Sequence, residues 1–210
     1  MNQKISNKLA WGIILPFLLV VGLLILNKTA VQDWWHQARY TPSTQIQLLA
    51  DAAEMSDEGE RLFFRADPEL ISRAKTEALC LGPDNLGCLV DGPKIYLLEY
   101  EDNGSPEYFQ SVVTAAHEML HMVYYRLGDE EKSDVNQMID NALANRVEDS
   151  RIFNTLNKTS TDQEYYDEAH SLLGTEIDFL PLSLEAHYQK YFDNRENVLD
   201  AFDKSKSLLQ

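Results

Sequence analysis

The stretch Thr114–Tyr125, which reads TAAHEMLHMVYY, decides both the fold and the chemistry of this chain. His117 and His121 lie four residues apart, and Glu118 directly follows the first histidine. Apolar residues fill most of the positions around them, which is typical of a helix buried in a core. On a helix, side chains at i and i+4 share a face, with Cβ atoms about 6 Å apart, so both imidazoles can reach one ion.

The residue types in this spacing predict a zinc site with its own catalytic base. Imidazole nitrogens bind Zn²⁺ at about 2.0–2.1 Å, and zinc lowers the pKa of a bound water to about 7. Glu118, at the edge of the same face, is expected to take a proton from that water without binding the metal. The alternative interpretation is an amphipathic helix with two unrelated histidines. The chain has only 5 histidines in 210 residues, so this motif arises by chance in on the order of one such sequence in a hundred.

In this setting HEMLH resembles the zincin metallopeptidases. The resemblance implies a zincin-like domain, hydrolysis of a peptide or protein substrate, and a substrate-aligning edge strand just before the motif helix, at Ile95–Tyr100. The residues after His121, MVYYRLGDE, include no third histidine, which excludes the metzincin pattern HExxHxxGxxH. The resemblance is therefore to the gluzincins, in which a glutamate from a later helix is the third zinc ligand.

That later helix is expected in QEYYDEAHSLLGTE, and it offers several candidates for the third ligand. Glu168 lies in its middle, beside the apolar Leu172 at i+4, and is the preferred ligand. Glu176, just past the expected end of the helix, is the next choice, and His170 is a further alternative, either as a ligand or as an oxyanion donor. Glu164 belongs to a capping box and has a sufficient structural role there.

The charge of the chain excludes nucleic acid as a partner. The formal net charge is −16, with 34 acidic against 18 basic residues, whereas phosphate binding needs a basic face. We interpret the acidity as a contribution to solubility.

The N-terminal region predicts a membrane anchor. Leu9–Leu26 is an uncharged run of 18 residues, and as a helix it would span about 27 Å, close to the hydrocarbon thickness of a bilayer. A cleaved signal peptide is the alternative, but LILNKTAVQDWW offers only a poor cleavage site. We expect residues 1–29 to form a cytoplasmic tail and transmembrane helix, 30–43 a linker, and 44–210 an extracytoplasmic domain.

Cys80 and Cys88 bracket the turn-forming sequence LGPDNLG. In an oxidising compartment this spacing predicts a local disulfide, whereas a zinc pair or a nucleophilic thiol would need a CxxC motif or a nearby histidine.

The remaining pattern predicts an α+β, predominantly helical domain with a small N-terminal β element and C-terminal helices. A short strand is expected at 61–65 and a hairpin from 89–90 and 95–100. Helices are expected over 70–79, 107–127, 135–143, 162–174, 181–191 and 196–208, with another starting at Thr44.

Two functions of different classes follow. The first is a membrane-anchored zinc metallopeptidase with His117, His121 and Glu168 as ligands and Glu118 as base. The second is a catalytically silent zincin-like module for binding or assembly at the membrane surface. For the first, a peptide, a protein and a cell-wall crosslink all remain open as substrates.

Overall fold

The computed structural model describes Ile14, Leu18 and residues 39–80, 86–90, 94–101, 104–145 and 149–207. The chain divides into two compact units, Met1–Tyr40 and Thr41–Gln210. The predicted anchor at 9–26 lies outside the described residues, apart from Ile14 and Leu18. Among the described residues, no helix has both the length and the apolar character needed to cross a bilayer.

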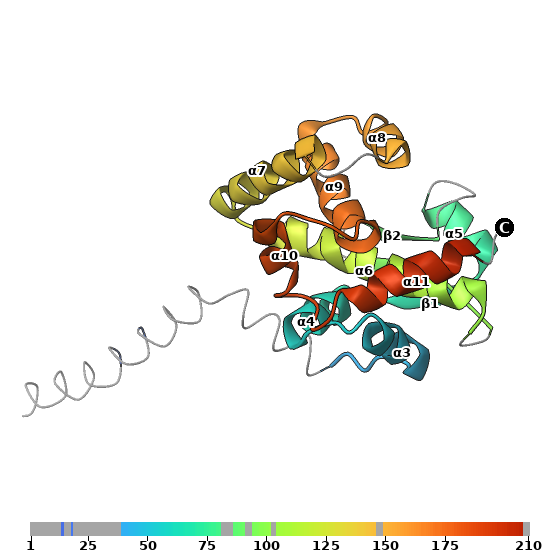
Figure 1. The fold of residues 1–210 in the computed structure, drawn as a ribbon. Coiled ribbons are helices and arrows are strands. Elements are labelled where there is room, and N and C mark those ends of the chain that lie inside the picture. Colours follow the sequence, from blue (N-terminus) through green and yellow to red (C-terminus); the bar gives the residue numbers. More distant parts are fainter. Residues whose placement is uncertain are drawn as a thin grey trace, which may run out of the picture. The chain divides into compact units, whose positions relative to one another are not determined.

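The second unit is a predominantly helical α+β domain with one small sheet, as expected (Figure 1). In chain order its elements are α3 (Thr44–Ala52), α4 (Asp57–Arg65), β1 (Glu69–Ile71), α5 (Arg73–Leu79), β2 (Gly87–Val90), β3 (Lys94–Leu98), α6 (Pro106–Arg126), α7 (Asp129–Asn145), α8 (Ser150–Leu156), α9 (Asp162–Glu176), α10 (Leu182–Tyr188) and α11 (Glu196–Ser207).

The sheet has the strand order β1-β3-β2. β3 pairs in parallel with β1, with Leu97 opposite Leu70, and antiparallel with β2, with Tyr96 opposite Cys88. The antiparallel pair confirms the predicted hairpin. The prediction that the strand at 95–100 is an edge strand is wrong, because β1 pairs with β3 from the other side. The pairing of β1 with β3 joins residues about 27 positions apart in the sequence, so no local sequence pattern indicates it. The edge strand of the hairpin is β2.

The motif helix α6 runs through the middle of the domain (Figure 1). Ser105 caps its first turn by accepting a hydrogen bond from the Tyr108 N–H at 3.1 Å, and Pro106 occupies the first helical position, where its missing N–H costs nothing. The helix packs against α9 and α11 and also against α3, α4 and two strands of the sheet. Because it is covered on many sides, α6 is apolar over most of its circumference.

Of two predictions for the N-terminal part of the domain, one is wrong and the other is confirmed only in part. The predicted strand at 61–65 is the second half of α4, which Ser56 caps by accepting a hydrogen bond from the Gly59 N–H at 3.2 Å. The predicted helix at 70–79 is β1 followed by α5, which begins only at Arg73. Paired aromatic residues favour a strand on propensity alone, but here the buried face of a helix accommodates Phe63.

The C-terminal helices agree better with their predictions. α7, α9, α10 and α11 overlap the predicted segments, whereas α8 was not predicted. The predicted capping box is confirmed in part at α9: the Thr161 hydroxyl accepts from the Glu164 N–H at 3.2 Å, whereas the Glu164 carboxylate accepts from the N–H of Ser160, one residue before the cap, at 2.8 Å. α8 has 7 residues, too few for a helical period to stand out in the sequence.

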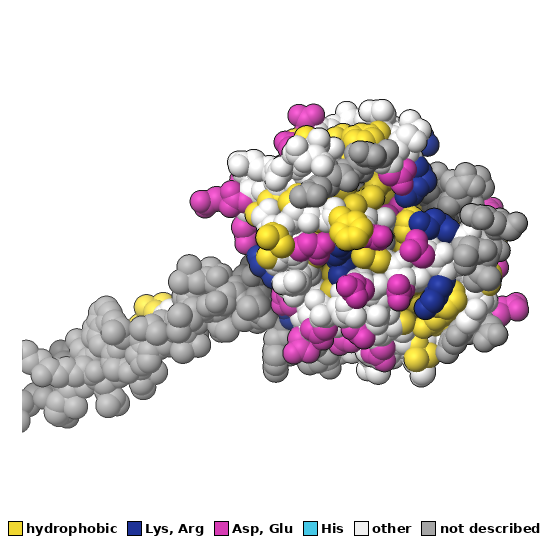
Figure 2. All heavy atoms as spheres, in the orientation of Figure 1, with side chains coloured by type: hydrophobic (Ala, Val, Ile, Leu, Met, Phe, Trp, Pro, Cys, Tyr) yellow, Lys and Arg dark blue, Asp and Glu magenta, His cyan; other side chains and the backbone are white. Residues whose placement is uncertain are grey.

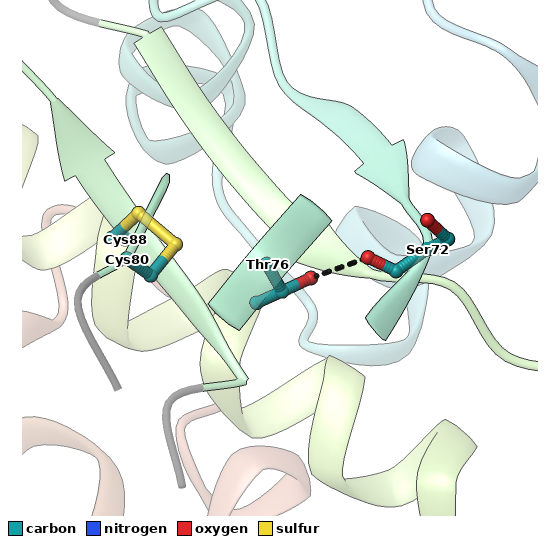
Figure 3. Close-up of a disulfide and its surroundings, with 4 residues drawn as sticks. All are labelled: Ser72, Thr76, Cys80 and Cys88. Atoms are coloured by element: carbon teal, nitrogen blue, oxygen red, sulfur yellow. Dashed lines mark hydrogen bonds between the residues drawn. A yellow bond between two sulfur atoms is a disulfide. The ribbon is translucent and has the colours of Figure 1, made fainter. Parts of the chain in front are cut away.

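The two cysteines form the predicted disulfide, which joins the end of α5 to β2 (Figure 3). Cys80 is the residue just past α5, and Cys88 lies within the strand.

A glycine sets how closely α9 approaches α6. A Cβ atom at Gly174 would lie 2.3 Å from the Leu120 Cδ1 on α6 and 2.9 Å from the Tyr188 Cε1 on α10. Both distances are far below van der Waals contact, so any side chain at this position would push α9 away from α6.

We therefore expect Gly174→Ala to lower the free energy of unfolding by about 1–3 kcal/mol, although alanine is the better helix former. Urea denaturation followed by circular dichroism measures the change. Gly104→Ala is the matched control, because nothing lies within 4 Å of a Cβ atom there. Equal stability of the two variants would contradict this description of the α6–α9 contact.

Candidate metal centre

Two turns of α6 bring the three motif side chains together. Nitrogen atoms of His117 and His121 and a carboxylate oxygen of Glu118 all lie within 4.8 Å of one another. The two histidines are half-buried, whereas Glu118 is only 5% exposed. The predicted i, i+4 geometry is present: the His117 Nε2 and His121 Nε2 atoms lie 3.1 Å apart.

α9 adds the preferred third donor, Glu168. Its Oε2 atom lies 3.8 Å from the His117 Nε2 and 3.5 Å from the His121 Nε2. From these separations, a point in the plane of the three atoms and equidistant from them lies about 2.0 Å from each, which matches Zn–N and Zn–O bond lengths of about 2.0–2.2 Å. Two imidazole nitrogens and one carboxylate oxygen therefore fit one small divalent ion.

Asp167, next to Glu168 on α9, hydrogen-bonds to the His121 ring nitrogen that faces away from the other donors. Its Oδ1 atom lies 2.8 Å from the His121 Nδ1, so the imidazole donates through Nδ1–H and turns Nε2 toward the other donors. Asp167 is not among the site residues predicted from the sequence. The one sequence feature that could have indicated it is its place directly beside the predicted ligand Glu168. Whether an acidic residue of α9 reaches the His121 Nδ1 depends on how α9 packs against α6, which the sequence does not show.

The electrostatics of the site divide the carboxylates into two kinds. Burial raises the pKa of Glu118, although His121, His117 and a hydrogen bond from the Leu89 backbone N–H oppose the shift. Burial would also raise the pKa of Glu168, but its interactions with His117 and His121 outweigh burial and lower it. Glu168 is therefore held as an anion, whereas Glu118 binds a proton more readily than an ordinary glutamate.

His121 is strongly stabilised as a cation when no metal is bound. Burial alone would lower its pKa, but the Asp167 hydrogen bond and the charges of Glu118, Asp167 and Glu168 raise it to about 9. A bound divalent cation would interact favourably with the same carboxylates, so it would displace the second ring proton of His121.

The site opens into a cavity of about 340 Å³. The motif residues His117, Glu118 and His121 line it together with Asp167 and Glu168, and the opposite wall is Gly87–Leu89 of β2. β2 can approach α6 because position 87 has no side chain: a Cβ atom there would lie 2.6 Å from the Thr114 Cγ2. The edge strand therefore stands directly beside the three motif side chains.

The other predicted ligands lie elsewhere. Glu176 pairs with Arg151. His170 is fully buried, and its Nε2 lies 2.9 Å from the His187 Nε2, so neither the ligand role nor the oxyanion role predicted for it fits this position. Burial lowers the pKa of His170, and it lowers that of His187 to about 4, so both imidazoles are neutral and serve packing between α9 and α10.

No protein-family model, no curated protein and no solved structure matches this chain. A function can therefore be inferred only from the residues of the site and their geometry.

Truncating Asp167 tests its role in holding His121. We expect Asp167→Ala to weaken zinc affinity by about 10–100-fold, because His121 loses the partner that orients its ring. Competition with a chromophoric chelator measures the affinity. Asp162→Ala, an exposed position on the same helix, is the control and should leave the affinity unchanged. An unaltered affinity in Asp167→Ala would remove this residue from the metal centre.

Proposed function

We propose that this chain is a membrane-anchored zinc metallopeptidase of the zincin type. The observation that carries the proposal is the convergence of His117 Nε2, His121 Nε2 and Glu168 Oε2 around one point about 2.0 Å from each. A chance pair of histidines on α6 would not account for a carboxylate from α9 at the same point, or for Asp167 behind His121.

Each side chain then has a distinct role. When bound, the zinc ion supplies Lewis acidity, lowering the pKa of a coordinating water and polarising the substrate carbonyl. Glu118 accepts the proton of the attacking water and passes it to the leaving amine. Its burial favours the protonated form of the carboxyl group, and Leu89 of β2 lines the cavity beside it. Asp167 keeps His121 in the orientation that binds the metal.

The edge strand supports a peptide as the substrate. Within the part of the chain that the structure describes, β2 pairs with β3 alone, and its other side borders the cavity. An extended peptide can add to such an edge through main-chain hydrogen bonds to outward-facing groups such as those of Gly87, which places a backbone carbonyl near the metal centre irrespective of its side chains.

Two features support an anchored domain outside the cytoplasm. The 18-residue uncharged run at the N-terminus has the length of a membrane span. The Cys80–Cys88 disulfide is of the kind that persists in oxidising compartments and is rare in the cytosol.

Replacing the base separates metal binding from hydrolysis. We expect Glu118→Gln to retain one zinc ion per chain and to lower kcat by about 10²–10⁴-fold, since the amide cannot accept the proton. Elemental analysis and cleavage of a peptide library by residues 30–210 measure the two properties. Glu107→Gln, an exposed position in the first turn of the same helix, is the control.

Wild-type turnover by Glu118→Gln would contradict the mechanism. A wild-type protein that binds zinc and cleaves no peptide would instead support the silent binding or assembly module.

A further inference from the structure

The direction of the backbone groups in β2 follows from its register with β3. The Leu98 N–H donates to the Leu86 carbonyl at 2.8 Å, and hydrogen-bonded and non-hydrogen-bonded pairs alternate along an antiparallel ladder. Cys88 therefore bonds to β3 through its main chain, whereas the N–H and C=O groups of Gly87 and Leu89 point away from β3 toward the cavity. This direction turns the Leu89 N–H toward the cavity that the Glu118 carboxylate also lines, and there it lowers the pKa of that carboxylate.

The strand that makes this contact is short. β2 has 4 residues, and among the residues that the structure describes its strand neighbour is β3 alone. Such a strand is held weakly by its ladder alone, since edge strands open at lower free energy than central ones. The proposed ligands are positioned differently, because His117, His121 and Glu168 all lie on the long helices α6 and α9.

The disulfide supplies a second attachment for β2. Cys88 lies between the two residues whose backbone groups face the cavity, and it is itself part of the cavity lining. Its partner Cys80 is 6% exposed and follows α5, which packs against β3. Thr76 is the buried residue of α5, and its hydroxyl donates to the Ser72 carbonyl at 3.2 Å within the same helix (Figure 3).

We propose that the Cys80–Cys88 disulfide is a positioning element of the active site, which holds β2 so that the Leu89 N–H meets the Glu118 carboxylate. The inference rests on the proposed function and adds to it a structural division. The α6–α9 pair holds the metal, and the disulfide-bound edge strand aligns the base. Loss of the disulfide therefore impairs turnover and leaves metal binding intact.

The test compares the Cys80→Ala, Cys88→Ala double variant with wild type. We expect one zinc ion per chain and unchanged zinc affinity, but a fall in kcat of at least about tenfold, because small misplacements of a catalytic group cost about that much or more. Backbone amide exchange in the metal-free protein gives a readout independent of activity: the Leu89 amide should be protected in wild type and exchange freely in the double variant.

A proline at position 89 tests the same contact with the disulfide intact. Leu89→Pro deletes the N–H that points away from β3, and an edge strand tolerates proline at such a position. We expect it to lower kcat as much as the double variant does, whereas Leu89→Ala, which keeps the N–H and loses the side chain, should keep kcat within about threefold of wild type. Combining Leu89→Pro with the cysteine substitutions should lower kcat no further, because both act through one contact.

Wild-type kcat in the folded double variant would overturn the inference, and so would strictly additive effects or an unprotected Leu89 amide in wild type. Loss of zinc from the double variant would also overturn it, since the disulfide would then support the metal centre itself. These results differ from failure of the proposed function, which would appear in the wild-type protein as absence of zinc or of hydrolysis and would overturn both.

Figure 2 shows acidic side chains dispersed over the face that it presents, with apolar side chains among them.

Discussion

The close packing of α9 against α6 is the constraint on which the rest of the site depends. A glycine at position 174 lets the helices approach until Leu120 fills the space of a missing Cβ atom. About two turns earlier on α9, the same approach brings Asp167 and Glu168 to the imidazoles of α6. The helices are joined by long intervening chain, so the contact depends on apolar burial rather than on proximity in sequence. Core packing therefore determines whether a carboxylate reaches the two histidines.

Much of the site could be predicted because its chemistry is local. His117, Glu118 and His121 share one helix, and helical periodicity alone fixes their relative positions. The boundaries of α6 were also readable, since Ser105 and Pro106 mark its start. Glu168 could be preferred over its neighbours because it lies in the middle of a capped helix. Asp167 was missed because hydrogen bonding to the far side of an imidazole depends on the rotation of α9 about its axis.

The sheet was harder to predict for the same physical reason. The β2–β3 hairpin is a local pair, and its alternating residues made it recognisable. β1 pairs in parallel with β3 across α5, and its 3 residues carry no periodic signal. The strand at the edge beside the site is therefore β2, and the strand predicted at 95–100 lies in the centre of the sheet. In the same region, Ser56 caps the start of α4, a helix that includes the residues 61–65 for which a strand is predicted.

X-ray absorption spectroscopy at the zinc edge shows whether His117, His121 and Glu168 hold one zinc ion. For the zinc-loaded protein we expect a first shell of nitrogen and oxygen atoms at about 2.0–2.1 Å and outer-shell scattering from two imidazoles. The His121→Ala variant should reduce the imidazole contribution to one. A shell with sulfur at about 2.3 Å, outer-shell scattering from fewer than two imidazoles in wild type, or protein that takes up no zinc would contradict the proposed zinc site.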